Sequence, residues 1–318
     1  MITIGDISVL FESVTPVEGD LLFEGHDPND RRLGETVSVG KDAYHDARWI
    51  MVGCPQDEGV KRNRGRTGAA AGPREIRRAF YRLASPAGLR TGHLCDVGDV
   101  RVGPSLEETH ATHEAVVSRI LRDGKRAIVL GGGNDISYPD CVALSRVTKE
   151  LVAFNIDSHF DVREGDQRHS GTPYRQLLDE RILDPTNFYE MASIPGANSP
   201  VYEEYLNRLG VNVYPLEAMR AHGIEQLLEQ VLGETDGDAL FWGFDLDAVR
   251  SMDAPGVSAS SPLGLTAEEI CLIGRIAGAD LRTRIIEITE MNPKHDLDER
   301  TAKLAALILW YFLQAVVD

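Results

Sequence analysis

Short apolar runs without polar alternation recur along the chain, and longer amphipathic segments separate them. Continuous apolar runs suit strands that are covered on both faces, as in a parallel sheet. The predicted strands are Trp49–Gly53, Ala127–Leu130, Leu151–Ile156, Val211–Tyr214, Ala239–Phe244 and Arg284–Thr289. The predicted helices are Pro73–Leu83, Leu106–Leu121, Ser137–Val147, Ile224–Leu232, Ala267–Ala277 and Asp298–Val317. This βα order predicts an α/β fold, with a mainly parallel central sheet between two helical layers in one three-layer αβα domain.

Domain organisation follows from length and composition. The chain has 318 residues, and it contains no internal repeat and no strong linker. We therefore expect residues 46–318 to form a single domain. Residues 1–45 are polar and rich in Asp and Gly, so we expect them to form an arm packed on that domain.

Charge and hydropathy exclude several classes of partner. There are 33 basic and 50 acidic residues, a formal net charge of -17, which disfavours binding to nucleic acid or to anionic membranes. The longest apolar run, at 304–317, is too short to span a bilayer. The N-terminus does not resemble a secretory signal, and the four cysteines form no metal-binding or disulfide pattern. These features favour a soluble, cytoplasmic protein.

Potential metal ligands follow two of the predicted strands. Asp157, His159 and Asp161 come directly after the strand 151–156, and Asp245 and Asp247 follow the strand 239–244. Alternate residues of a strand lie on the same face, so each group should converge on one place. Four carboxylates gathered there would repel each other unless cations balanced them. The pattern therefore predicts a metal centre.

The ligand types indicate which metal is bound. Oxygen ligands with one imidazole suit Mn²⁺ better than Zn²⁺, which prefers Cys and His, or Ca²⁺, which seldom binds His. The number of carboxylates suffices for two ions, roughly 3.5 to 4 Å apart with a bridging water that becomes a hydroxide nucleophile.

Several motifs resemble the ureohydrolase superfamily of arginases and agmatinases, from about Gly53 to the C-terminus. They are GCPQDEGVKRNRGRTGAAAGPREIR at 53–77, LGGGND at 130–135, IDSHFD at 156–161, FDLDA at 244–248 and EITEMNP at 287–293. The resemblance implies that Asp157 and Asp245 bridge the two metals and that Asp161 binds the first. It also implies that His159 and Asp247 bind the second metal, and it suggests homo-oligomers, either trimers or hexamers.

Three features are similar to the formiminoglutamase branch: SGTPY at 170–174, Arg163 after Asp161, and the long loop DLDAVRSMDAPGVSASSP at 245–262. The resemblance implies hydrolysis of N-formimino-L-glutamate to L-glutamate and formamide, a late step of histidine breakdown. Asp161 would then relay a proton from the water to the leaving nitrogen, and Glu290 would hold the substrate amidinium.

A dicarboxylate substrate needs cationic side chains near the pocket. Arginine suits bidentate recognition of carboxylates. The predicted substrate-binding residues are Arg64, Arg66, Arg163, Ser170, Gly171, Arg175 and Glu290. Agmatine, a cation, would have no use for these arginines.

Asn134 departs from the family pattern, because the loop usually supplies a histidine to the first metal. Its amide oxygen can bind Mn²⁺ more weakly, and the alternative is a helix N-cap. Two other functions therefore stay open: an agmatinase or guanidinobutyrase, and a non-catalytic family member with a weakened metal site. His110 and His113, at near-helical spacing, are expected on a solvated helix face.

Overall fold

A ten-stranded sheet forms the centre of the molecule. The computed structural model describes residues 6–316 except 24, 26 and 88. The strands are β1 (Val14–Thr15), β2 (Ser38–Val39), β3 (Trp49–Gly53), β4 (Leu94–Val100), β5 (Arg126–Leu130), β6 (Leu151–Ile156), β7 (Phe188–Ser193), β8 (Asn212–Pro215), β9 (Ala239–Asp245) and β10 (Thr283–Thr289). Their order is β1-β4-β3-β5-β10-β9-β6-β7-β8, and β2 pairs with β4. Only the β1–β4 pairing is antiparallel among these described strands, which confirms the predicted mainly parallel sheet.

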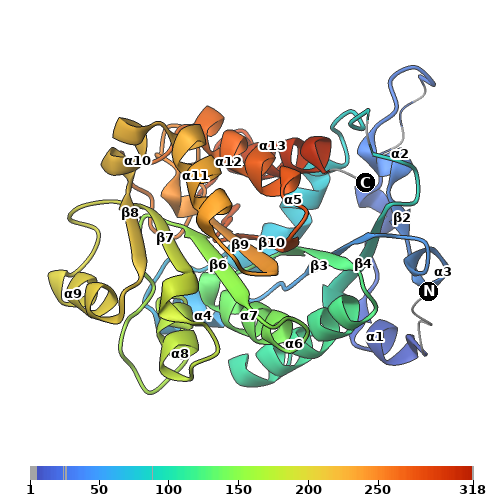
Figure 1. The fold of residues 1–318 in the computed structure, drawn as a ribbon. Helices are drawn as coiled ribbons and strands as arrows, with labels where there is room; N and C mark the ends of the chain where they lie inside the picture. The colour runs from blue at the N-terminus through green and yellow to red at the C-terminus, as the bar shows by residue number, and fades with distance from the viewer. Residues whose placement is uncertain (1–5, 24, 26, 88, 317–318) are drawn as a thin grey trace.

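Helices cover both faces of the sheet (Figure 1). One layer contains α5 (Gly72–Phe80), α10 (Leu216–His222), α11 (Ile224–Glu234), α12 (Ala267–Ala279) and α13 (Arg300–Ala315). The other contains α1 (Ser8–Glu12), α6 (Leu106–Arg122), α7 (Ser137–Ser145), α8 (Pro173–Asp179) and α9 (Pro200–Leu209). The short helices α2 (Leu33–Thr36), α3 (Lys41–Tyr44) and α4 (Glu58–Arg62) lie in the N-terminal segment and the first loop. The three-layer αβα prediction is thus confirmed.

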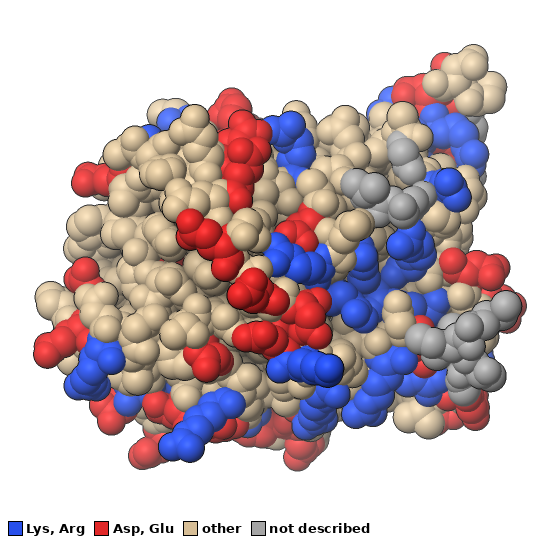
Figure 2. All heavy atoms as spheres, in the orientation of Figure 1, with Lys and Arg blue, Asp and Glu red and all other residues tan. Residues whose placement is uncertain are grey.

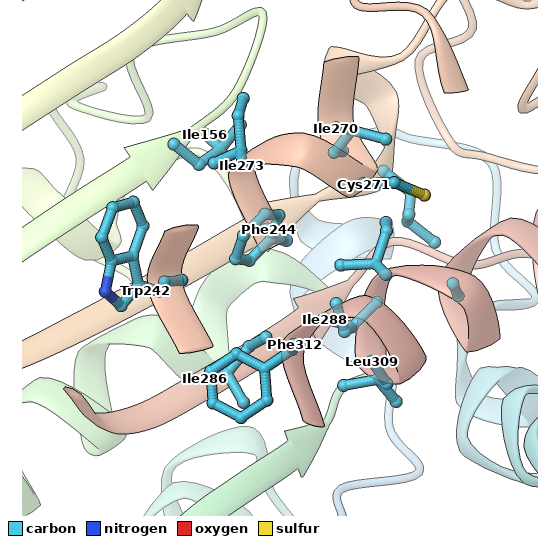
Figure 3. Packing of buried hydrophobic residues seen from close by; sticks show 14 of the residues in the cluster. Ile156, Trp242, Phe244, Ile270, Cys271, Ile273, Ile286, Ile288, Leu309 and Phe312 are labelled. Atoms are coloured by element: carbon cyan, nitrogen blue, oxygen red, sulfur yellow. The ribbon is translucent and has the colours of Figure 1, made fainter. Parts of the chain in front are cut away.

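Successive residues of each central strand enter two different hydrophobic cores. In β3, Trp49 and Met51 pack with α5 and α13, whereas Ile50 and Val52 pack with α6 and α7. Figure 3 shows the first core, where side chains from β9, β10, α12 and α13 meet. Burial on both faces explains why these strands have no polar alternation.

Besides β1 and β2, the strands β4 and β7 were not predicted, because each of these two carries polar residues whose partners lie on other elements. Asp96 and Asp99 of β4 pair with Arg77 of α5, whose side chain is 2% exposed. Glu190 of β7 accepts hydrogen bonds from Asn155 of β6 on both carboxylate oxygens, at 3.1 Å each. The partners come from other elements, so local sequence gives no sign of them.

The N-terminal segment has more regular structure than the irregular arm we expected. Its strands β1 and β2 both pair with β4, and Leu10, Leu33 and Tyr44 are buried. Residues 1–5, 24 and 26 of the predicted arm, and Val317 of the predicted last helix, lie outside the described residues.

The surface carries both signs of charge despite the net charge of -17. In Figure 2, basic side chains gather on one part of the visible face and acidic ones on neighbouring parts. Within the described residues, none of the helices has the length and apolar character needed to cross a bilayer.

Candidate metal centre

The predicted site residues meet at one edge of the sheet. The strands β5, β10, β9 and β6 are neighbours in this order, and all four are parallel. Their carboxyl ends therefore lie side by side, where ligands bind in open α/β sheets. Asn134 follows β5, Glu290 follows β10, Asp245 ends β9 and Asp157 follows β6.

Two ligand sets form at this edge, and both contain Asp157. In one set the ligand atoms of Asp157, His159 and Asp247 lie within 4.8 Å of one another, and in the other those of Asp157, Asp161 and Asp245 do. The shared position of Asp157 agrees with a bridging role for this residue. Asp245 belongs to only one set, so its bridging role stays a prediction.

Short turns hold these carboxylates. Asp157 Oδ1 accepts the backbone N–H of His159 at 2.7 Å, and Asp245 Oδ1 accepts that of Asp247 at 2.8 Å. Each turn uses one oxygen of its carboxylate. The other oxygen of Asp157 is buried without a hydrogen-bond partner among the described residues.

Burial and mutual repulsion govern protonation here. Burial, followed by repulsion from Asp247, raises the pKa of Asp157 and of Asp245 well above the usual range. Burial also raises the pKa of Asp161 to about 6. Asp247 is the exception: burial opposes ionisation, but the neighbouring His159 lowers the pKa of Asp247 below its usual value. His159 Nδ1 lies 3.2 Å from Asp247 Oδ1, so each of these two groups favours the charged form of the other.

This donor set fits Mn²⁺. It offers four carboxylates and one imidazole, and a buried oxygen of Asp157 has no partner in the described residues. Buried carboxylates of this density are stable as anions only when cations neutralise them. Oxygen-rich sites with an imidazole are typical of Mn²⁺.

Asn134 lies beside this cluster, and its amide nitrogen faces Asp161. Nδ2 donates to Asp161 Oδ2 at 2.7 Å, while Oδ1 lies 2.9 Å from the Thr289 hydroxyl and 3.2 Å from that of Ser137. The side chain does not cap a helix. The cap alternative is therefore wrong, and the role of Asn134 as a metal ligand stays a prediction.

Glu290 and Asp161 both have left-handed backbone conformations, with φ of 64° and 48°. Such conformations are uncommon for residues other than glycine and often occur at functional sites. Glu290 Oε1 accepts the backbone N–H of Asn134 at 3.0 Å, and Oε2 is buried without a described partner. Burial raises the pKa of Glu290 well above its usual range, so a cationic group beside it would restore its charge.

Arg163 and Ser170 line the same cavity with Asn63, whereas Gly171 contacts Arg163 but is not part of the lining. Arg163 Nη1 donates to Asn63 Oδ1 at 3.1 Å, and Asn63 Nδ2 donates to Ser170 Oγ at 3.0 Å. Arg163 N donates to the Gly171 carbonyl at 2.8 Å. The cavity, of about 70 Å³, is lined by Asn63, His159, Asp161, Arg163, Ser170, Asp245, Asp247, Ser258, Ala259 and Glu290.

Sequence reasoning missed Asn63, Ser258 and Ala259. Asn63 stands between the arginines of KRNRGR, and Ser258 and Ala259 belong to the long loop after Asp247. Both segments carry a sequence signal, since they contain or adjoin predicted site residues. Which of their side chains face the cavity depends on how the loops fold.

The other three predicted arginines are not brought to the cavity wall. Arg175 donates to Asp179 at 2.7 Å and lies 4.0 Å from the Tyr205 ring centroid, so its guanidinium is already engaged on the surface of α8. Arg64 is exposed. Arg66 uses its guanidinium on the backbone of the 257–258 segment. These three assignments to the substrate carboxylates are therefore corrected.

The expectation for His110 and His113 was also wrong. Both are buried, and their Nε2 atoms lie 2.7 Å from Asp135 and 2.8 Å from Asp140. Burial lowers the pKa of His113 to about 4. The helix α6 turns this face toward α7, so the two histidines form part of the polar interior rather than a solvated surface.

Comparison with known proteins gives a consistent picture. The arginase family model matches residues 47–314. The chain is similar to formimidoylglutamase of Paraburkholderia xenovorans (strain LB400), with 34% identity over 97% of this chain and 94% of the relative. It is 32% identical to formimidoylglutamase of Salmonella typhi, over 91% of this chain and 95% of the relative. The crystal structure of Trypanosoma cruzi formiminoglutamase with Mn²⁺ superposes with a TM-score of 0.84 and 33% identity, covering 90% of this chain and 98% of that one.

Proposed function

Because the chain belongs to the arginase family, we propose that it uses Mn²⁺ to hydrolyse N-formimino-L-glutamate to L-glutamate and formamide. One observation carries the choice of substrate: one small cavity is lined by the buried Glu290, by Arg163 and by part of the ligand cluster, namely His159, Asp161, Asp245 and Asp247. The cavity thus pairs an anion for an amidinium with a cation for a carboxylate. The two formimidoylglutamases and the Trypanosoma cruzi enzyme support this choice.

Two Mn²⁺ ions would be held by Asp157, His159, Asp161, Asp245 and Asp247, with Asn134 as a neutral sixth ligand. Bound Mn²⁺ would supply Lewis acidity, which makes water a competent nucleophile near neutral pH. For Asn134 to act as a ligand its amide must rotate, because the nitrogen now faces Asp161. Binding of a metal by His159 requires its neutral imidazole, whereas the neighbouring Asp247 raises the pKa of His159 and favours the charged form.

Asp161 is the proposed general acid and base. A carboxylate beside the attacking water can accept and return a proton. One carboxylate oxygen of Asp161 would take a proton from the attacking water. It would then deliver the proton to the glutamate nitrogen as the bond between that nitrogen and the amidine carbon breaks.

Glu290 and Arg163 would orient the substrate. The free Oε2 of Glu290 would bind the amidinium and place its carbon beside the carboxylate cluster. Arg163, held by Asn63 at 3.1 Å, would bind a carboxylate of the glutamate portion, Ser170 would complete that wall, and the Gly171 carbonyl would hold the Arg163 backbone. Agmatine has no carboxylate for Arg163 to bind, and 4-guanidinobutyrate has only one.

A direct test measures hydrolysis of N-formimino-L-glutamate, agmatine and 4-guanidinobutyrate by metal-stripped protein titrated with Mn²⁺. Bound metal is counted by elemental analysis. Turnover of formiminoglutamate that saturates near two Mn²⁺ per subunit is expected. Preferred turnover of either guanidine compound would replace the proposal with an agmatinase or guanidinobutyrase, and no turnover of any substrate would favour a non-catalytic family member.

Assembly into homo-oligomers, trimers or hexamers, remains a prediction. A cytoplasmic location likewise remains a proposal. Light scattering coupled to size-exclusion chromatography measures the number of subunits directly.

A further inference from the structure

The guanidinium of Arg66 binds the backbone of the loop that closes one side of the cavity. Arg66 Nε donates to the Ser258 carbonyl at 3.0 Å, and Nη2 donates to the Val257 carbonyl at 2.5 Å. The backbone N–H of Arg66 donates to Ser258 Oγ at 3.1 Å. One residue thus makes three hydrogen bonds to two consecutive residues, two of them from a charged donor.

The segment at 258–260 depends on these bonds. On its N-terminal side, Gly256 is tied to Asn292 and Thr301, at 2.7 and 2.8 Å. On its C-terminal side, the Ser261 carbonyl accepts the backbone N–H of Ser251. Among the described hydrogen bonds, those that hold Ser258 come from Arg66.

Arg66 is itself fixed by the turn that carries Glu290. The buried Asn292 side chain donates to the Arg66 carbonyl at 2.8 Å. Gly65 lets the two loops approach this closely, because a Cβ atom at this position would lie 2.5 Å from Ser258 Oγ. Three segments therefore meet at Arg66: the loop after β3, which contains Arg66 itself, the 257–259 segment, and the turn that carries Glu290.

We infer that Arg66 is a positioning residue: it clamps Val257 and Ser258 so that Ser258 and Ala259 form a wall of the substrate cavity. The inference rests on the proposed function for its substrate, and it assigns Arg66 a role in KM rather than in the chemical step. The guanidinium is suited to this task because its planar fork reaches two carbonyl oxygens at once. A lysine ammonium is a single point charge and would hold one of them.

The test compares Arg66→Ala, Arg66→Lys and Arg64→Ala with the wild-type protein loaded with Mn²⁺. Arg64 belongs to the same loop, carries the same charge and is exposed like Arg66, but among the described hydrogen bonds none joins its side chain to the 257–258 segment. We expect Arg66→Ala to raise KM for formiminoglutamate by about tenfold, which corresponds to the loss of charged hydrogen bonds, and to change kcat by less than about threefold. The KM of Arg66→Lys should lie between those of Arg66→Ala and the wild type. The KM of Arg64→Ala should be closer to the wild-type value than that of either Arg66 variant.

Limited digestion with elastase provides a second readout that needs no substrate. This protease cleaves after small residues, and it should cut the 257–260 segment faster in Arg66→Ala than in Arg64→Ala or wild type. Equal rises of KM in Arg64→Ala and Arg66→Ala, with unchanged cleavage, would overturn the clamp in favour of a simple charge effect. If the wild-type protein fails to hydrolyse formiminoglutamate, the proposed function fails, and the cleavage rates alone decide for or against the clamp.

Discussion

The amide nitrogen of Asn134 lies 2.7 Å from Asp161 Oδ2, so the residue in the position of the usual histidine ligand donates a hydrogen bond to the proposed general base. The amide oxygen is near two hydroxyl groups, those of Thr289 and Ser137. Asn134 therefore has two possible duties: it orients Asp161 by its nitrogen, or it binds a cation by its oxygen. One amide orientation cannot serve both.

Asn134→His should separate these two duties. An imidazole is a stronger ligand for Mn²⁺ than an amide oxygen, so we expect the affinity for the first ion to rise by about tenfold. We expect no gain in kcat, because the hydrogen bond that orients Asp161 is lost. Isothermal titration with Mn²⁺ and steady-state kinetics measure the two effects. Unchanged metal affinity together with unchanged turnover would contradict this prediction.

Asp161→Asn should abolish most of the activity. The amide cannot accept and return a proton, and loss of a general acid and base typically lowers kcat by about 10²- to 10⁴-fold. Asp166→Asn, an exposed residue of the same loop, is the matched control and should keep near wild-type kcat. Metal content must be measured for both variants, since Asp161 is also a proposed ligand. A fully loaded Asp161→Asn variant with normal kcat would rule out the proton relay.

Mn²⁺ should bind more tightly as the pH rises from 5 to 8. The pKa of Asp161 is about 6, and burial raises those of Asp157 and Asp245 too, so protons compete with the cation for the metal-free site. Below these pKa values the protonated carboxyls compete with the metal, and above them they do not. For each proton displaced, the apparent affinity should change by about tenfold per pH unit. Affinity independent of pH across this range would contradict the protonation pattern.

The raised pKa values also affect the metal-free protein. A carboxyl whose pKa is higher in the folded state stabilises the fold below the pKa of the unfolded chain, and this stabilisation is lost as the pH rises through the folded pKa. For Asp161 the window extends from the usual value of 3.8 to about 6. We expect this group to lower the free energy of unfolding of the apo protein across that window, and added Mn²⁺ to reverse the loss. Thermal melts with and without Mn²⁺ measure both changes.

Arg163→Ala should raise KM for formiminoglutamate with a smaller effect on kcat. A charge-assisted hydrogen bond to a carboxylate contributes about 1.5–3 kcal/mol, so KM should rise by roughly 10- to 100-fold. Arg175→Ala removes an arginine that binds Asp179 and Tyr205 instead, and its KM should change little. A larger rise of KM in Arg175→Ala than in Arg163→Ala would restore the original assignment of Arg175.

Arg77→Ala should destabilise the fold. Its guanidinium is buried and binds Asp96 at 2.7 Å and Asp99 at 2.5 Å, so truncation leaves two carboxylates without their partner. Breaking a buried pair in this way typically costs about 3–5 kcal/mol. Arg74→Ala in the same helix breaks exposed pairs with Glu18 and Asp20, which water and salt screen, so it should lower the stability much less. Urea denaturation measures the free energy of unfolding of both variants. Equal losses of stability would argue against a stabilising role for the buried pairs of Arg77 with Asp96 and Asp99.

Patterns within single elements were enough to predict the six strands and six helices whose sequences are uniformly apolar or amphipathic. They were also enough to place Asp157, His159, Asp161, Asp245 and Asp247 at strand ends. A parallel sheet brings its carboxyl ends to one edge whatever the loops do, so convergence of these ligands followed from their positions alone. The family resemblance added Asn134 and Glu290 to the same edge.

Tertiary structure decided the environment of the polar and charged side chains whose binding partners lie elsewhere in the chain. The strand β4 escaped prediction because Arg77 neutralises its aspartates, and His110 and His113 are buried because Asp135 and Asp140 meet them from α7 and its preceding turn. The arginines show the same limit. Arg163 reaches the cavity, Arg66 binds a loop and Arg175 of α8 binds Asp179, although all three carry the same charge. The groups that surround a side chain in space determine which partner it binds. Local sequence determines only which groups are its neighbours along the chain.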